Sequence, residues 1–125
     1  MPRFTIASLA VPVIQAPMAG GPSTPRLAAA VSAAGGLGFL AAGYKSAGAL
    51  LAEIEATREL TGAAFGVNVF VPQQAVANPD EVERYARSLA PDAARFGVAL
   101  GDPRHDDDDW DAKVDVLLKE APAVV

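Results

Sequence analysis

The hydrophobic residues of this chain fall into short runs that alternate with longer amphipathic stretches. Short apolar runs are typical of strands buried on both faces, and amphipathic stretches are typical of helices that cover them. We expect strands at residues 13–15, 37–42 and 65–71, and the beginning of a fourth at 121–125. We expect helices at residues 25–34, 47–60, 79–90 and 110–120. This alternation predicts a parallel α/β fold.

The first predicted helix has a marked beginning and a marked end. Thr24 is placed to be its N-cap, Pro25 its first helical residue, and Gly35 the residue that ends it. The residues that we expect on its buried side are Leu27, Val31 and Ala34.

The later helices are predicted from the same kind of pattern. Ser46 is a plausible N-cap for the second helix, and Pro91 should stop or break the third, with a shorter helical piece over residues 92–96. The residues expected on the buried sides are Leu50, Leu51, Ile54 and Leu60 in the second helix, and Val114, Leu117 and Leu118 in the last.

The third predicted strand carries one polar side chain, Asn68. Because side chains alternate along a strand, Val67, Val69 and Val71 point one way, and Asn68 points the other way. A buried amide without a hydrogen bond costs about 1–3 kcal/mol. Either a neighbouring backbone group satisfies Asn68, or its amide holds a group of a cofactor.

A glycine-containing turn follows the first predicted strand, at Pro17, Met18, Ala19, Gly20 and Gly21. A flat, electron-accepting ring needs backbone N–H donors at one edge and a soft apolar side chain against its face. This turn can supply both. The same residues are equally consistent with a tight strand-to-helix loop that buries a methionine.

Residues 36–41 match the glycine pattern of dinucleotide-binding proteins. That pattern must follow a strand and open a helix, whereas here it follows a helix and opens a strand. We therefore interpret the glycines as a helix end and a site of close helix-to-strand packing. A nicotinamide-binding Rossmann domain is the weaker alternative.

Composition and charge exclude several other classes of site. The chain has 125 residues, a net charge of −5, no cysteine and one histidine, His105, which is followed by four aspartates. Scattered basic residues argue against nucleic acid, and the lack of a long apolar run argues against a membrane span or a signal peptide. We expect a soluble, cytoplasmic protein in which the aspartates are a solvated helix start rather than a metal site.

Three motifs together resemble the N-terminal part of the nitronate monooxygenases, formerly called 2-nitropropane dioxygenases. The motifs are Gln15-Ala16-Pro17-Met18-Ala19-Gly20 with Ser23-Thr24-Pro25, then Ala34-Gly35-Gly36-Leu37-Gly38, then Gly66-Val67-Asn68-Val69-Phe70-Val71-Pro72. Their order and spacing are those of the family, and the resemblance covers nearly the whole chain. The family consists of FMN-dependent (β/α)8 TIM-barrel enzymes.

The resemblance implies a fold and a cofactor. Because such a barrel needs about 250 residues, residues 1–125 would be the N-terminal segment of a single FMN-binding domain, apparently truncated, with about three strands and the start of a fourth. Pro17, Met18, Ala19 and Gly20 would shape the site of the flavin ring, and Asn68 would contact FMN.

The resemblance also implies a reaction. Alkyl nitronates would be oxidised with O2 to carbonyl compounds and nitrite. The catalytic histidine would lie beyond Val125, since His105 does not match it, and the segment alone should be inactive. Tyr44 could line the pocket, although packing is the simpler role.

Two alternatives stay open at this point. Related barrels with similar opening motifs are NAD(P)H-dependent enoyl or quinone reductases, which are distinguished by whether NAD(P)H reduces the flavin. In the other, the chain is a non-catalytic barrel fragment that forms a homo-oligomer through an open sheet edge.

Overall fold

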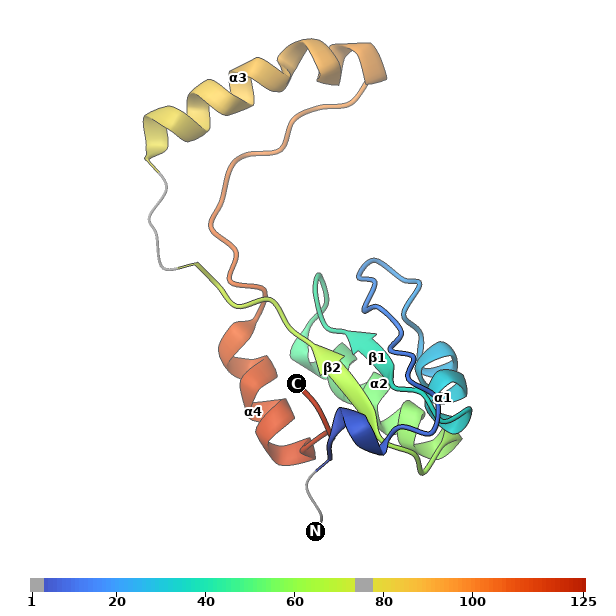
Figure 1. The fold of residues 1–125 in the computed structure, drawn as a ribbon. Helices are drawn as coiled ribbons and strands as arrows, with labels where there is room; N and C mark the ends of the chain where they lie inside the picture. Colours follow the sequence, from blue (N-terminus) through green and yellow to red (C-terminus); the bar gives the residue numbers. More distant parts are fainter. Residues whose placement is uncertain (1–3, 74–77) are drawn as a thin grey trace. The chain divides into compact units, whose positions relative to one another are not determined.

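The structure, a computed structural model, describes residues 4–73 and 78–125 (Figure 1). The chain forms two compact units. The sheet unit comprises the residues up to Pro72 together with those from Asp108 to Val125, and the helix unit comprises the residues from Gln73 to Asp107.

The sheet unit is built on two parallel strands, β1 (Gly38–Ala41) and β2 (Phe65–Asn68). One parallel bridge on each side extends this pair, because Ile14 pairs with Leu37 and Val124 pairs with Gly66. The outer strands predicted at residues 13–15 and 121–125 are therefore present as single bridges.

These four strand positions lie side by side in the order of the sequence. In a dinucleotide-binding fold, the fourth strand lies beside the first. Here Val124 pairs with Gly66 of the third position, so the Rossmann alternative is wrong. The interpretation of the glycine pattern is confirmed, because Gly35 has a φ of 93° just after the first helix and β1 begins at Gly38.

Both regular strands are shorter than predicted. β1 lacks the two end residues of the predicted run 37–42, and β2 ends at Asn68, although the apolar run continues to Val71. The side chain of Val71 is 72% exposed. An apolar run indicates which residues can be buried, whereas a strand ends where the neighbouring backbone stops pairing with it.

Three helices cover one face of the sheet: α1 (Pro25–Ala33), α2 (Ala47–Leu60) and α4 (Trp110–Glu120) (Figure 1). A short 3-10 turn, η1 (Ile6–Ser8), precedes them. The core on this face consists of Ala28, Leu40, Ala42, Leu50, Ile54, Phe65, Val67 and Leu117. Because Val67 points to the helices, Asn68 is on the opposite face of the sheet, as the alternation predicts.

The caps of α1 and α2 are confirmed. The Thr24 Oγ1 accepts a hydrogen bond from the Leu27 N–H at 3.2 Å, with Pro25 as the first helical residue. The Ser46 Oγ accepts one from the Ala49 N–H, also at 3.2 Å. Each of these two capping bonds joins residues three positions apart in the sequence.

The predicted buried side of α1 is wrong. Its buried residues are Ala28, Ala29 and Ser32, whereas Ala34 is exposed and the larger Leu27 and Val31 are half-buried. The reason is the close approach of β1, because a Cβ atom on Gly38 would overlap the backbone of Ala28. Only a side with small residues can lie this close to a strand.

The predicted sides of α2 and α4 are right in part. Leu50, Ile54 and Leu117 are buried, but Leu60 is 55% exposed and Leu118 is 75% exposed. Thr57 in α2 and Lys113 in α4 occupy buried positions instead. Lys113 and Leu117 are one turn apart and both buried, so together they define the inner side of α4. Leu118 is rotated by about 100° from Leu117 around the helix axis.

The helix unit contains one long helix, α3 (Pro79–Phe96), which ends at Gly97 with a φ of 66°. The predicted break at Pro91 is wrong, because α3 continues through it. Proline in a helix removes the hydrogen bond to the carbonyl four residues earlier, here that of Arg87. Because α3 has no buried residue, water can solvate this carbonyl. None of the described helices is long and apolar enough to cross a membrane.

We predict that Gly38→Ala destabilises the protein by about 3 kcal/mol, because the new methyl group meets the rigid backbone of Ala28 rather than a movable side chain. The measurement is the urea midpoint of unfolding. Gly62→Ala is the matched control, since no atom lies within 4 Å of its Cβ position, and its midpoint should stay the same or rise slightly. Equal midpoints for the two variants would contradict the close packing.

Candidate functional site

The amide of Gln15 joins the first strand position, β1 and the following loop. Its Oε1 accepts a hydrogen bond from the Phe39 N–H at 2.9 Å. Its Nε2 donates to the Ser23 Oγ at 2.9 Å and to the Ala16 carbonyl at 2.6 Å. The side chain of Gln15 therefore continues the hydrogen-bond ladder at the position where the backbone leaves the sheet.

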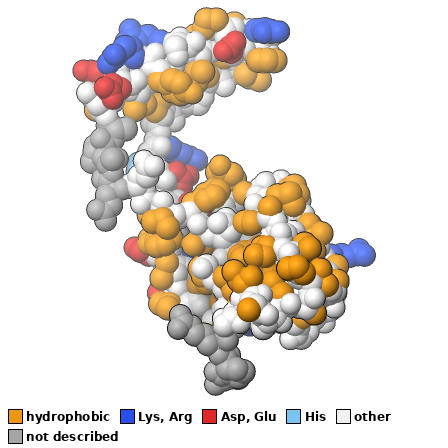
Figure 2. All heavy atoms as spheres, in the orientation of Figure 1, with side chains coloured by type: hydrophobic (Ala, Val, Ile, Leu, Met, Phe, Trp, Pro, Cys, Tyr) orange, Lys and Arg blue, Asp and Glu red, His pale blue; other side chains and the backbone are white. Residues whose placement is uncertain are grey.

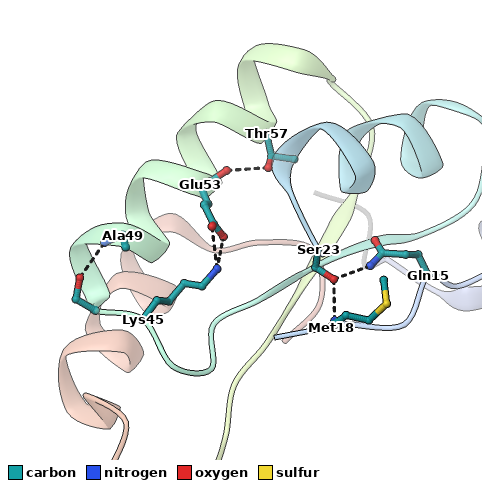
Figure 3. A network of polar contacts seen from close by, with 8 residues as sticks. Gln15, Met18, Ser23, Lys45, Ala49, Glu53 and Thr57 are labelled. Atoms are coloured by element: carbon teal, nitrogen blue, oxygen red, sulfur yellow. Dashed lines mark hydrogen bonds and ion pairs between the residues drawn. The ribbon is translucent and has the colours of Figure 1, made fainter. Parts of the chain in front are cut away.

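Ser23 closes the loop between the first strand position and α1. It is 3% exposed, and its Oγ accepts a second hydrogen bond, from the Met18 N–H at 2.7 Å. The Ser23 N–H in turn donates to the Met18 carbonyl at 3.3 Å. Figure 3 shows Gln15, Met18 and Ser23 joined in this way. A side chain as small as serine thus determines the path of residues 16–22.

The loop carries backbone N–H donors that have no acceptor among the described residues. Gly20 has a φ of 83° and Gly21 a φ of 128°, and no atom lies within 4 Å of the Cβ position of either. Within the described parts of the chain, the N–H groups of Ala19, Gly20 and Gly21 meet no protein acceptor. Met18 is 40% exposed beside them in this segment.

Asn68 is at the same edge of the sheet, because the carboxyl ends of parallel strands meet there. One strand separates it from the loop after Gln15, which corresponds to about 10 Å across the sheet. Its backbone carbonyl accepts a hydrogen bond from the Ala42 N–H at 2.9 Å. Its half-buried side-chain amide has no hydrogen-bond partner among the described residues.

An aromatic pair follows the two strands at this edge. Tyr44 and Phe70 have ring centroids 5.4 Å apart and planes at 70°. The Phe70 ring lies where a side chain on Gly43 would be, so this position requires glycine. Tyr44 is 81% exposed and has a φ of 63°. Next to it, Lys45 pairs with Glu53 at 2.8 Å (Figure 3).

The aspartate run is more than a solvated helix start. The side chain of Asp109 makes no capping bond to α4, and its Oδ2 instead accepts a hydrogen bond from the Ala47 N–H of α2 at 2.8 Å. Asp108 accepts one from the Tyr44 N–H at 2.9 Å and pairs with Lys113 at 2.8 Å. His105 is in the helix unit. Among residues 4–73 and 78–125, no group of three His, Cys, Asp or Glu could hold a metal ion.

The sequence patterns identified some of these residues and missed others. Met18, Ala19, Gly20 and Asn68 are at one sheet edge, and exposed Pro17 begins the loop. We assigned no role to Gln15 or Ser23, although a polar residue beside an apolar run is a signal of a buried hydrogen bond. Asp108 gave no comparable signal, because the Tyr44 N–H that it binds is 64 positions away in the sequence.

Known proteins resemble this chain in sequence. A protein of Bacillus subtilis (strain 168) named "Probable nitronate monooxygenase" is 42% identical over 115 residues, which are 90% of this chain and 32% of that protein. A protein of the same name from Staphylococcus aureus (strain JH9) is 46% identical over 84 residues, covering 67% of this chain and 23% of that protein. The chain thus spans about a third or less of the length of these curated relatives.

A solved structure resembles it in fold. A nitroalkane oxidase from Streptomyces ansochromogenes matches 94% of this chain and 33% of its own, with 52% identity and a TM-score of 0.83. Together with the sequential order of the parallel strands, this similarity confirms the predicted fold class, the N-terminal part of a (β/α)8 TIM barrel. The model of the nitronate monooxygenase family matches residues 2–125, and the chain therefore belongs to the nitronate monooxygenase family.

Proposed function

We propose that the polypeptide containing these residues is an FMN-dependent oxidoreductase that oxidises alkyl nitronates with O2 to carbonyl compounds and nitrite. The observation that carries this proposal is the loop at residues 17–21, in which three backbone N–H groups that have no acceptor among the described residues lie beside a half-exposed methionine. In a (β/α)8 barrel, active sites lie at the carboxyl ends of the strands, where this loop is found.

The residues present fit a flavin. Backbone N–H groups of Ala19 and Gly20 would donate to the polar edge of the ring, and the Met18 thioether would lie against its face. Pro17 would fix the start of this loop, and the Asn68 amide would bind a polar group of the cofactor. When bound, FMN supplies the capacity to accept electrons from the substrate.

The residues of this chain would position the cofactor and donate hydrogen bonds to it, and the catalytic base would come from elsewhere. Gln15 and Ser23 hold the loop in one conformation, so that cofactor binding would not have to order it. We propose that the histidine base and the phosphate site come from parts of the polypeptide outside these residues. His105 has no place in this scheme.

We further propose that the partners are a small-molecule nitronate and O2, that the protein is cytoplasmic, and that it uses neither nucleic acid nor a membrane. The charge of −5 supports the exclusion of nucleic acid. A homo-oligomer through the open sheet edges remains an alternative for the isolated segment, and sedimentation of a dilution series measures it.

The experiment that tests the function is a visible absorption spectrum of the native polypeptide, followed by anaerobic additions. Bound flavin should give a yellow protein, which an alkyl nitronate bleaches and NADH does not. Bleaching by NADH would move the assignment to the enoyl or quinone reductases. A colourless protein that takes up no added FMN would refute the flavin site.

We predict that Asn68→Ala weakens FMN binding about tenfold, because one hydrogen bond to the cofactor is lost. The measurement is titration of the apoprotein with FMN by flavin fluorescence. Asn78→Ala is the matched control, since Asn78 caps α3 in the helix unit, and its FMN affinity should equal that of the wild type. An unchanged affinity in Asn68→Ala would mean that Asn68 does not contact the cofactor.

We predict that Ser23→Ala lowers the free energy of unfolding by about 1–3 kcal/mol and also weakens FMN binding. The reason is that Gln15 and Met18 both lose their acceptor in a buried place. Urea unfolding and the same FMN titration measure the two effects. Ser88→Ala, on the exposed side of α3, should change neither, and an equally stable Ser23→Ala protein would argue against the loop closure.

A further inference from the structure

A buried ion pair lies beneath the loop that follows β1. The side chain of Lys113 is 1% exposed, and its Nζ is 2.8 Å from the Asp108 Oδ2. The Asp108 Oδ1 accepts a hydrogen bond from the Tyr44 N–H at 2.9 Å. One carboxylate therefore joins a buried cation of α4 to the backbone of the loop at residues 43–46.

The loop is held in a conformation that it would not adopt by itself. Tyr44 has a φ of 63°, in the left-handed region that residues other than glycine rarely occupy. Asp108 and Asp109 also have positive φ values, of 57° and 58°. Such residues persist only where surrounding contacts determine them. Here these contacts are the hydrogen bonds that the Tyr44 N–H donates to Asp108 and the Ala47 N–H donates to Asp109.

Stability alone is a poor reason for the buried lysine. Replacing a buried ion pair with apolar residues of similar volume is often neutral or stabilising. Lys113 is on the inner side of α4, one turn before the core residue Leu117, where a methionine would continue the apolar side. The charge of Lys113 is explained by its effect on conformation, because it fixes the position of the Asp108 carboxylate, which in turn holds the Tyr44 backbone.

The loop presents an aromatic surface at the edge of the sheet that carries the proposed flavin site. The Tyr44 ring is 81% exposed and packs edge-on against Phe70, which is 41% exposed. Phe70 is two residues after Asn68. This ring pair is therefore outside the core and beside the residue that we assign to the cofactor.

We propose that Lys113 and Asp108 are positioning residues, and that the Tyr44 and Phe70 rings which they hold form an apolar rim of the substrate site. The rim contacts the hydrocarbon part of the substrate, since aromatic faces offer a large and rigid apolar surface. This inference rests on the proposed function. It adds that the substrate site prefers nitronates with longer alkyl chains.

Amide hydrogen exchange tests the positioning without any need for activity. In Lys113→Met, exchange at the Tyr44 amide should become about tenfold faster, because its acceptor is no longer anchored. Lys119→Met is the matched control, with the same substitution on an exposed part of α4, and should leave this amide unchanged. Asp108→Leu/Lys113→Met removes both charges, leaves no unpaired buried ion, and should show the same faster exchange.

Steady-state kinetics with nitronates of increasing chain length test the rim. Tyr44→Ala should raise KM for a five-carbon nitronate about threefold and leave kcat within about twofold. Lys113→Met should do the same. The combination Lys113→Met/Tyr44→Ala should be no worse than Tyr44→Ala alone, because both changes act through one ring.

Each outcome decides a separate point. An unchanged Tyr44 exchange rate in both Lys113 variants overturns the positioning. Faster exchange with unchanged KM values, or additive effects on KM in the combined variant, overturns the rim. If the native polypeptide does not oxidise nitronates, the proposed function and the rim fail together, while the exchange rates still support or overturn the positioning.

Discussion

The hydrogen bonds of a single side chain, Gln15, determine how the first strand position turns into the loop above the sheet. A parallel strand must give its neighbour's N–H groups acceptors along its whole length, yet the chain has to leave the sheet to begin α1. Gln15 resolves this conflict, because its Oε1 accepts from the Phe39 N–H while its backbone already turns away. The other end of the same amide binds Ser23, so the sheet edge and the loop share one rigid connection.

Residues close in sequence made the helix ends and the loop predictable. The caps at Thr24 and Ser46, the glycine after α1 and the glycine turn at Gly20 each depend on a few neighbouring residues, and each is found as expected. The fold class also followed, since alternating apolar runs and amphipathic helices allow few arrangements. The three sequence motifs also indicated the nitronate monooxygenase family, and the match to the family model confirms it.

The sequence could not show which side of a helix meets the sheet when packing runs against hydrophobicity. In α1 the small residues are inside because Gly38 brings β1 too close for Leu27. In α4 a charged side chain is inside because its partner, Asp108, is folded beneath the loop. The bond from Asp108 to Tyr44 joins residues 64 positions apart, and no local pattern predicts such a contact. Pro91 did not break α3 as predicted, because α3 is exposed and water can solvate the carbonyl group that loses its hydrogen bond.

The attachment at Asp108 also sets how freely the chain can vary in length. The helix unit, from Gln73 to Asp107, leaves the sheet unit after β2 and returns to it at Asp108, where Tyr44 and Lys113 fix the point of return. The entropic free-energy cost of closing such a connecting segment rises by only about 0.6 kcal/mol for each doubling of its length. The connection between β2 and α4 is therefore a natural site for insertions, deletions and grafted segments, because a change in its length leaves the pairing of the barrel strands on either side unaltered.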